Sequence, residues 1–483
     1  MISLLLGAVL LSNEPSYETN HVEGWKVHVS TELLQEHPRE TSLALDLIAE
    51  QLKTIRKVVP APAVKKLTTV SLWLSPAYEG FAQTAEYHPS AEWLVQNGRS
   101  ASMAKGIEFT NILNFEAESR RMPSLVLHEL AHAFHDQFIE GGFGNLAIQR
   151  AYEQAKLFGW YEDVQRRDAS GKVSIESAYA LTNAKEYFAE LTEAYFGIND
   201  FFPFTQADLA KHDPGGYGLM RSHWGLDTVS SPPAWMNLDP FYEKYYDAGG
   251  YPVVSSARVN DYALKETAYL INLLLARRPD IKRAMVQSGS RMIVMAWNEF
   301  TSDIPEYKWL EPAEFWDRRA RGLGGSRTDP VCSCAEENVL GYPGDPYSTE
   351  SIVIHEFAHN IHLRGLVNLD PTFDDRLKSV YQDAMSKGLW KGKYAATNHH
   401  EYFAEGVQSW FDNNREPDND HNHVNTRAEL LDYDPGLAEI CREVFGETEL
   451  TYTKPVTRLH DHLLGYDPSK APTFKWREKL GIG

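Results

Sequence analysis

The five residues HELAH at 128–132 return as HEFAH at 355–359, each inside an apolar segment. These segments run from Leu125 to Phe134 and from Ile352 to Ile361, and their spacing predicts partly buried helices. An HExxH sequence on a helix places its two histidines one turn apart on the same face. Both imidazoles can then reach one metal ion, so the sequence predicts two metal-binding helices.

Two further motifs repeat in the same order after each pentapeptide. TNAKEYFAE at 182–190 returns as TNHHEYFAE at 397–405, and TQADLAKHDPG at 205–215 returns as TRAELLDYDPG at 426–436. The separations between copies all exceed 200 residues, far longer than the units of a solenoid. The repeat therefore predicts two copies of one domain in tandem.

The regions before the motifs indicate the fold class. Residues 39–58 and 262–277 carry apolar side chains at helical spacing, and β-rich runs follow at Thr68–Leu74 and Arg291–Trp297. Each copy is expected to be α+β, a small sheet with packed helices and a helical half that holds the motifs. The expected boundaries are 1–12 for a signal peptide, 13–229 and 241–447 for the two domains, Ser230–Pro240 for a linker, and 448–483 for a C-terminal extension.

Composition excludes several functional classes. The 483 residues contain 47 basic and 67 acidic side chains, and the net charge of −20 argues against nucleic acid or anionic lipid as the main partner. No apolar run is long enough for a membrane-spanning helix. Three cysteines cannot form a four-cysteine zinc site, so histidines and carboxylates must hold any metal. A Cys334–Cys441 disulfide stays open if the chain is exported.

The N-terminus has two interpretations. Ile2–Leu11 is a short apolar run followed by polar residues, which is typical of a signal-peptide core. No basic residue precedes it and no clear cleavage site follows, so a buried first strand is the alternative. A signal would indicate a secreted, periplasmic or cell-envelope protein.

The second repeated motif offers a third metal ligand. Glu186 and Glu401 are its first glutamates, and Glu190 and Glu405 follow four residues later on the same helical face. One carboxylate could bind the metal while the next accepts the free N–H of a ligand histidine. The alternative is an amphipathic helix with two solvated acids.

The complete pattern, HExxH followed by Y-x-x-T-N-x-x-E-Y-F-A-E, stands at 179–190 and again at 394–405. It resembles the gluzincin zinc metallopeptidases, and among them the lethal-factor-like family of the anthrax lethal factor catalytic domain. The resemblance implies two tandem zincin-like domains with a zinc ion in each, and hydrolysis of peptide or protein substrates by a metal-activated water. The implied zinc ligands are His128, His132 and Glu186 in the first copy, and His355, His359 and Glu401 in the second. The implied general bases are Glu129 and Glu356, and the implied oxyanion donors are Tyr179 and Tyr394.

Other functions remain open beside the zinc metalloendopeptidase. Zinc could be structural in a binding or scaffold protein of the cell envelope, or one copy could be active and the other regulatory. Intact Glu129 and Glu356 favour the peptidase, because a structural site needs no base. If activity is unequal we expect the second copy to dominate, since its polar approach Cys332–Thr349 could line a cleft while residues 136–178 could block the first.

Four histidines near the motifs have less specific interpretations. His135 and His362 follow the HExxH motifs by three residues and are expected on a helix face or behind a ligand. His399 and His400 are expected to be a solvated pair, with substrate contact as the alternative.

Overall fold

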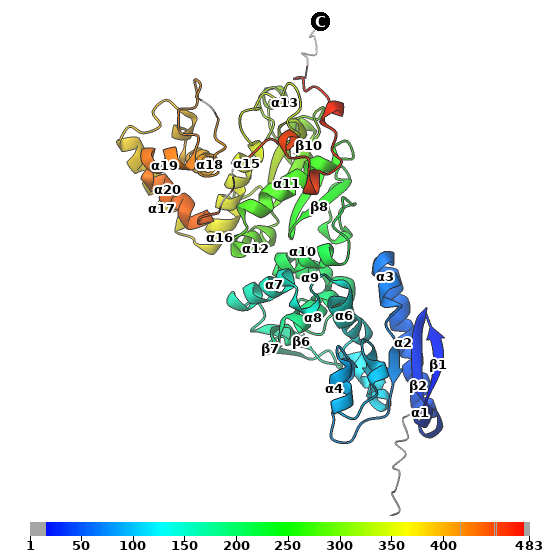
Figure 1. Cartoon of the computed structure of the whole chain (residues 1–483). Helices are drawn as coiled ribbons and strands as arrows, with labels where there is room; N and C mark the ends of the chain where they lie inside the picture. The colour runs from blue at the N-terminus through cyan, green and yellow to red at the C-terminus, as the bar shows by residue number, and fades with distance from the viewer. Residues whose placement is uncertain (1–15, 416, 449, 451, 478–483) are drawn as a thin grey trace, which may run out of the picture. The chain divides into compact units, whose positions relative to one another are not determined.

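A computed structural model describes residues 16–477 except 416, 449 and 451 (Figure 1). The expected signal peptide therefore lies outside the described residues. The chain is α+β, with several small sheets surrounded by helices. It divides into two compact units, and the first consists of residues up to Asp208 together with His223–Gly225. The second unit contains Leu209–Ser222 and the chain from Leu226 onward.

The segment Leu209–Ser222 was expected in the first domain, but its contacts lie with the second unit. Close backbone packing explains this. A Cβ atom on Gly218 would lie 2.7 Å from the backbone of Gly249, and one on Gly250 would lie 1.8 Å from the carbonyl of Pro214. Only glycine allows such an approach.

The first unit contains a five-stranded sheet. Its strand order is β1-β2-β3-β5-β4, in which β2, β3 and β5 run parallel and the two edge strands run antiparallel. The strands are β1 (Tyr17–Val22), β2 (Trp25–Ser30), β3 (Leu72–Leu74), β4 (Ala85–Tyr87) and β5 (Ile107–Phe109). The helices are α1 (Thr31–Glu36), α2 (Pro38–Val58), α3 (Ala61–Leu67), α4 (Ala91–Gln96), α5 (Phe115–Arg121), α6 (Leu125–Phe138), α7 (Leu146–Leu157) and α8 (Ala184–Phe196).

The second unit contains a four-stranded sheet in the order β11-β10-β9-β8. Strands β9 to β11 run parallel and β8 runs antiparallel, as β1 does in the first unit. The strands are β8 (Lys244–Ala248), β9 (Tyr251–Ser255), β10 (Arg291–Met295) and β11 (Val331–Ala335). The helices are α11 (Asp261–Leu274), α12 (Pro279–Gln287), α13 (Ala313–Asp317), α14 (Glu336–Leu340), α15 (Ile352–Asn360), α16 (Val367–Leu369), α17 (Phe373–Ser386), α18 (His399–Trp410), α19 (Arg427–Tyr433) and α20 (Pro435–Phe445). Two helices, α9 (Gln206–His212) and α10 (Pro214–His223), precede this sheet in the chain.

The segment Cys332–Thr349, expected as a polar approach to the second HExxH helix, is partly regular structure, with turns from residue 341 onward. It begins within strand β11 and continues into helix α14. All five residues of β11 are fully buried, so the strand shows no polar–apolar alternation. Buried cysteine behaves as a small apolar residue, and Cys332, Cys334 and Cys441 are all buried and free.

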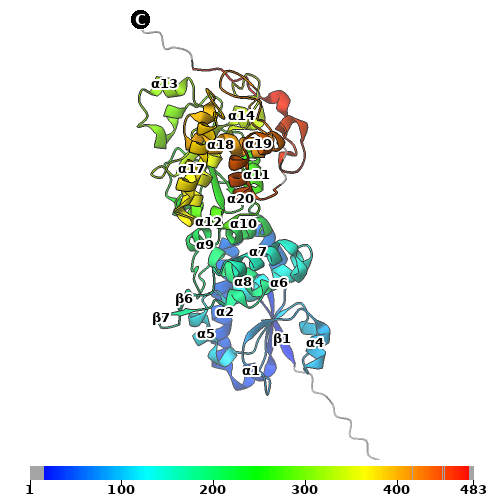
Figure 2. The same cartoon turned by 90° about the vertical axis from the view of Figure 1, so that its left-hand side faces the viewer.

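Residues 136–178 of the first unit also have defined structure. They contain helix α7 and an antiparallel hairpin of β6 (Val164–Arg167) and β7 (Val173–Glu176), which Figure 2 shows beside α8. The exposed side chains of β7 show that the hairpin is a surface element.

The C-terminal extension packs against the second unit. Arg458 Nη1 lies 3.0 Å and His462 Nε2 lies 2.7 Å from Glu266 Oε2 on α11, a carboxylate that is fully buried. Among the described helices, none is long and apolar enough to cross a membrane.

Candidate metal centres

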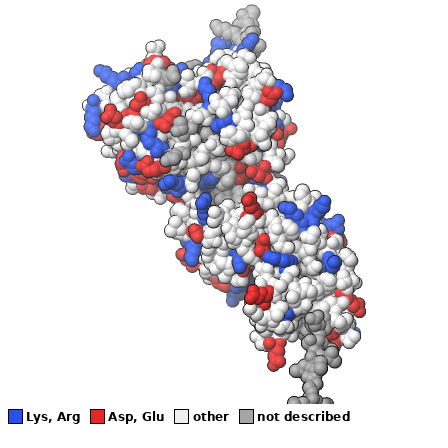
Figure 3. Space-filling view, in the orientation of Figure 1, with Lys and Arg blue, Asp and Glu red and all other residues white. Residues whose placement is uncertain are grey.

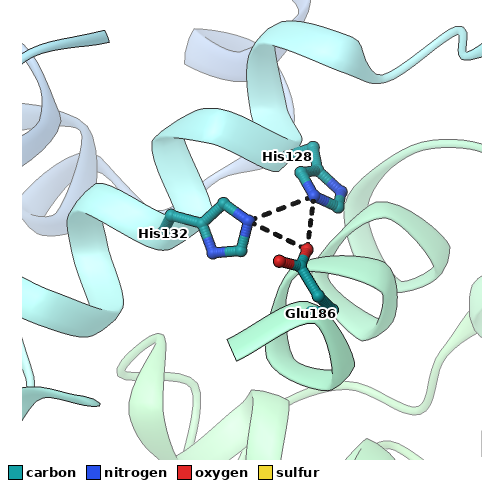
Figure 4. Close-up of side chains that lie close together, drawn as sticks. All are labelled: His128, His132 and Glu186. Atoms are coloured by element: carbon teal, nitrogen blue, oxygen red, sulfur yellow. Dashed lines mark hydrogen bonds and ion pairs between the residues drawn. The ribbon is translucent and has the colours of Figure 1, made fainter. Parts of the chain in front are cut away.

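The first centre is formed by helices α6 and α8, which lie side by side in both ribbon views (Figures 1 and 2). His128 and His132 project from one face of α6, and Glu186 comes from the first turn of α8 (Figure 4). The Nε2 atoms of the two histidines lie 3.2 Å apart, and Glu186 Oε2 lies 3.2 Å and 3.1 Å from them. Ligands about 2.0 Å from a tetrahedral zinc ion lie about 3.3 Å from one another. The three atoms therefore already have the spacing of zinc ligands.

A capping residue sets the position of each third ligand. Asn183 precedes α8, and its side-chain oxygen accepts hydrogen bonds from the backbone N–H groups of Lys185 and Glu186 at 2.9 and 3.1 Å. Asn398 caps α18 in the same way, with contacts of 2.8 and 3.0 Å. The asparagine of the repeated Thr-Asn pair is thus the N-cap of the helix, and it fixes the position of the third-ligand glutamate in the first turn.

The second centre repeats the first on helices α15 and α18. Glu401 Oε2 lies 3.1 Å from His355 Nε2 and 3.4 Å from His359 Nε2. The six predicted ligands therefore come together in two groups of three, one in each unit.

Charge balance at both centres favours a cation. Burial lowers the pKa of His128 and His355, but the neighbouring glutamates outweigh burial and raise both values well above the usual range. Burial likewise opposes ionisation of Glu186 and Glu401, yet their histidine contacts hold both carboxyl pKa values far below normal. Each triad thus stabilises positive charge between its members, whether a proton or a metal ion carries it.

The expected bases lie beside these triads. Glu129 is buried, and its Oε2 accepts a hydrogen bond of 2.9 Å from the backbone N–H of Tyr87 on edge strand β4. Burial raises the pKa of both Glu129 and Glu356, which brings each carboxyl closer to the range useful for proton transfer near neutral pH.

The expected oxyanion donors occupy short turns just before the capping asparagines. The ring centre of Tyr179 lies 6.3 Å from that of His128, and Tyr394 lies 6.1 Å from His355. Burial, followed by the nearby third-ligand glutamate, raises the pKa of both phenols, so each keeps its proton as a donor. Tyr179 is 47% exposed and Tyr394 is 36% exposed, so both side chains are accessible from solvent.

All ten predicted site residues therefore lie at two places, five in each unit. Comparison with family models, curated proteins and solved structures finds no match for the chain. The donor set of each centre is two imidazole nitrogens and one carboxylate oxygen. That set is typical of catalytic zinc sites that keep one position for water or substrate.

The groups in closest contact with the Nδ1 atoms of His128 and His355 are not the expected Glu190 and Glu405. His128 Nδ1 contacts Glu193 at 2.7 Å, whereas Glu190 accepts a hydrogen bond from Asn199. The prediction that Glu190 would orient the histidine is thus wrong by one helical turn. The alternative of solvated acids is also wrong, because Glu190 and Glu405 are both buried.

The second unit places an amide where the first has a carboxylate. Gln408, like Glu193, stands seven residues after the third ligand, and its Oε1 lies 2.8 Å from His355 Nδ1. Its Nε2 donates to Glu350 at 3.0 Å, which fixes the amide orientation. Glu405 lies 3.8 Å from the same histidine nitrogen. The helical spacing of seven residues from the third ligand could have indicated Glu193 and Gln408 in the sequence. The contact between Gln408 and Glu350 has no such signal in the sequence.

A glycine-rich segment that was not noticed in the sequence crosses helix α15. A Cβ atom on Gly322 would lie 3.0 Å from Glu356 Cγ, and one on Gly324 would lie 2.5 Å from His359 Cδ2. Leu323 between them forms a single antiparallel bridge with Ser333 on β11, as β4 pairs with β5 in the first unit. The segment therefore runs along the outer edge of the sheet directly over the metal helix.

Gly324→Ala is expected to reduce zinc binding at the second centre. The added methyl group would displace the His359 ring, because contacts below 3.0 Å to Cβ atoms are not tolerated in proteins. Zinc content per chain, measured after dialysis, should fall by about one. Gly144→Ala is the control, since a Cβ atom there meets nothing within 4 Å. Unchanged zinc in Gly324→Ala would show that the segment is free to move away.

The first centre opens into a cavity of about 660 Å³. Its lining includes the ligands, Glu129 and Tyr179, together with the cationic side chains Arg166 and Lys185. The cavity is large enough for several side chains of a peptide, so residues 136–178 leave this centre open. This observation weighs against the expectation that the second copy dominates.

Proposed function

We propose that the chain is a secreted zinc metalloendopeptidase of gluzincin type, with two tandem zincin-like domains that each bind one zinc ion. The observation that carries the proposal is the triangle of His128, His132 and Glu186 ligand atoms, whose sides are 3.1 to 3.2 Å. The resemblance to the lethal-factor-like peptidases supports the same function.

Each group at a centre has a distinct role in peptide hydrolysis. Zinc, when bound, supplies a Lewis acid that polarises the substrate carbonyl and makes water more acidic. Glu129 or Glu356 accepts a proton from the attacking water and delivers it to the leaving amine. Tyr179 or Tyr394 donates its phenolic O–H to the oxygen that gains negative charge.

Two features favour an enzyme over a scaffold with structural zinc. Structural zinc sites are normally closed by four protein ligands, whereas each centre here converges three. Burial raises the pKa of Glu129 and Glu356 beside the ligands, and a carboxyl group with a raised pKa in such a place is typical of a catalytic base.

Unequal centres are the second candidate, with one active and one regulatory copy. The exchange of Glu193 for Gln408 behind the ligand histidine favours this possibility, because such contacts tune metal affinity. The open cavity at the first centre leaves room for a substrate in that copy.

Peptides or proteins are the proposed substrates and nucleic acid is not. Figure 3 shows acidic and basic side chains interspersed on the visible face, where nucleic-acid binding would call for a basic patch. The proposed secreted or cell-envelope location depends on the apolar run at Ile2–Leu11 alone.

Zinc analysis combined with a degenerate peptide library tests this function. His128→Ala and His355→Ala should each remove about one zinc per chain, and the double variant should lose hydrolysis of the library. A chain that binds no zinc at either centre, or hydrolyses peptides equally well without it, would refute the proposal.

A further inference from the structure

A second imidazole cluster lies beyond the second centre on the continuation of its metal helix. After α15 the chain forms a π-helical turn, Ile361–Leu366, which contains the fully buried His362. Its Nε2 lies 3.1 Å from Asp374 Oδ1, yet it forms no well-directed hydrogen bond within the described part of the chain. Its Nδ1 lies 3.3 Å from His400 Nδ1. Buried polar atoms without partners are rare and call for an explanation.

The two carboxylate oxygens of Asp374 have different partners, cations on one side and histidines on the other. Its Oδ2 contacts Lys378 Nζ at 2.7 Å and Arg327 Nη2 at 3.2 Å. Its Oδ1 faces the histidines instead, 3.1 Å from His362 Nε2 and 2.9 Å from His399 Nε2. The two cations balance the carboxylate from one side and leave the other side to the imidazoles.

We propose that His362, Asp374 and His400 form a third zinc site, distinct from the two centres described above. One ligand atom from each lies within 4.8 Å of the others. Ligands on one zinc ion lie about 3.3 Å apart, so the half-buried His400 has to turn toward its partners when the ion binds. Two imidazoles and a carboxylate form a donor set that suits zinc, and His399 stands beside Asp374 as a further donor.

The site has an entry path from solvent. Asp374, His399 and His400 line a surface cavity of about 570 Å³. The buried His362 forms the inner side of the cluster, against Phe373 and Phe403. A zinc ion here would join the π-helical turn, α17 and the start of α18, the helix that carries Glu401.

Among the described residues of the first unit no corresponding cluster is found, although the unit has the corresponding histidine. His135 packs against Phe188 as His362 packs against Phe403, with ring centres 5.0 and 5.7 Å apart. Lys185 occupies the position of His400, two residues after the capping asparagine, and its Nζ lies over the ring of Phe143.

The position that corresponds to Asp374 also differs in the first unit. Tyr152 on α7 and Tyr381 on α17 both donate their hydroxyl groups to a carbonyl in the turn before the third-ligand helix. Seven residues before each stand Asn145 and Asp374, and Asn145 is an amide that caps α7. The first unit is therefore a matched control within the same chain.

Zinc binding to a chain without the two main centres tests the site. In the His132→Ala/His359→Ala background, each main triad lacks one histidine. Zinc should then be measured by mass spectrometry after dialysis against buffered zinc, with circular dichroism as the folding check. We expect one zinc per chain in this background and none after His400→Ala or Asp374→Asn is added. Lys185→Ala, the matched change in the first unit, should leave the one zinc in place.

Two results would overturn the site. They are a folded background chain that binds no zinc, and one zinc that survives both His400→Ala and Asp374→Asn. If the background variant does not fold, the same two substitutions are made in the wild-type chain, where each should remove one zinc. The two main centres are tested by a separate comparison. If both bind zinc, the wild-type chain should contain two more zinc ions than the background variant. The inference can therefore fail while the proposed function stands, and the reverse also holds.

Discussion

Replacing Glu129 and Glu356 together by glutamine is expected to lower peptide hydrolysis about 10²- to 10⁴-fold while zinc stays bound. An amide cannot accept the proton of the attacking water, and neither glutamate belongs to a ligand triad. Glutamine also keeps an oxygen that can accept the N–H of Tyr87, so the local fold should persist. Initial rates on a peptide identified from the library, together with zinc content, provide the measurement.

The single variants then assign activity to a centre. If Glu129→Gln alone removes hydrolysis, the first centre carries it, and if Glu356→Gln does so, the second centre carries it. Glu153→Gln on the exposed face of α7 is the control and should hydrolyse at the wild-type rate. A double base variant with full activity would exclude these glutamates as general bases.

Arg321→Met is expected to destabilise the second unit by about 3 to 5 kcal/mol, because it leaves a buried carboxylate without its partner. Arg321 and Glu337 are both fully buried and form a bidentate ion pair, with Nη2 and Oε2 3.0 Å apart. Arg321 Nη2 also donates to the carbonyl of Ala296 at 3.1 Å. Hydrogen exchange of amides in β9, β10 and β11 should report the lower free energy of opening.

The control for this variant is an exposed arginine three residues earlier. Arg318 contacts Glu314 at 3.4 Å on the surface, where such a pair contributes about 0.5 kcal/mol or less. Arg318→Met should therefore leave exchange from the sheet unchanged. Equal exchange in both variants would show that the buried pair contributes no more than the exposed one.

The sequence predicted helices better than strands. The helix expected at 39–58 is observed at Pro38–Val58, because its buried side chains follow helical spacing and proline begins its first turn. The strand expected at Thr68–Leu74 covers only Leu72–Leu74, because α3 ends at Leu67 and a turn follows it at residues 68–70. Strand β11 was missed because a fully buried strand of small residues has no alternating pattern.

The same distinction holds for the centres. His128 and His132 could be chosen because the HExxH spacing is local and specific, and Glu186 because its motif repeats and resembles that of a known family. Gly324 reaches the second centre from another part of the chain, and Glu350, although it precedes His355 by only five residues, meets Gln408 of α18 only in the folded chain. Asp374 is a similar case, as nothing in its own sequence neighbourhood indicates an imidazole partner.

The exchange of Glu193 for Gln408 has a consequence for how the chain fills with zinc. His128 Nδ1 has a carboxylate in direct contact, Glu193 at 2.7 Å, whereas His355 Nδ1 contacts the amide of Gln408 at 2.8 Å and its nearest carboxylate, Glu405, lies 3.8 Å away. We therefore expect His128 to be the more basic ligand. Contacts of this kind change metal affinity about 10- to 100-fold. As free zinc becomes scarce, the second centre should empty first, which leaves a half-loaded species over roughly one to two decades of zinc concentration. The number of occupied centres in the duplicated chain would then depend on the free zinc concentration around it.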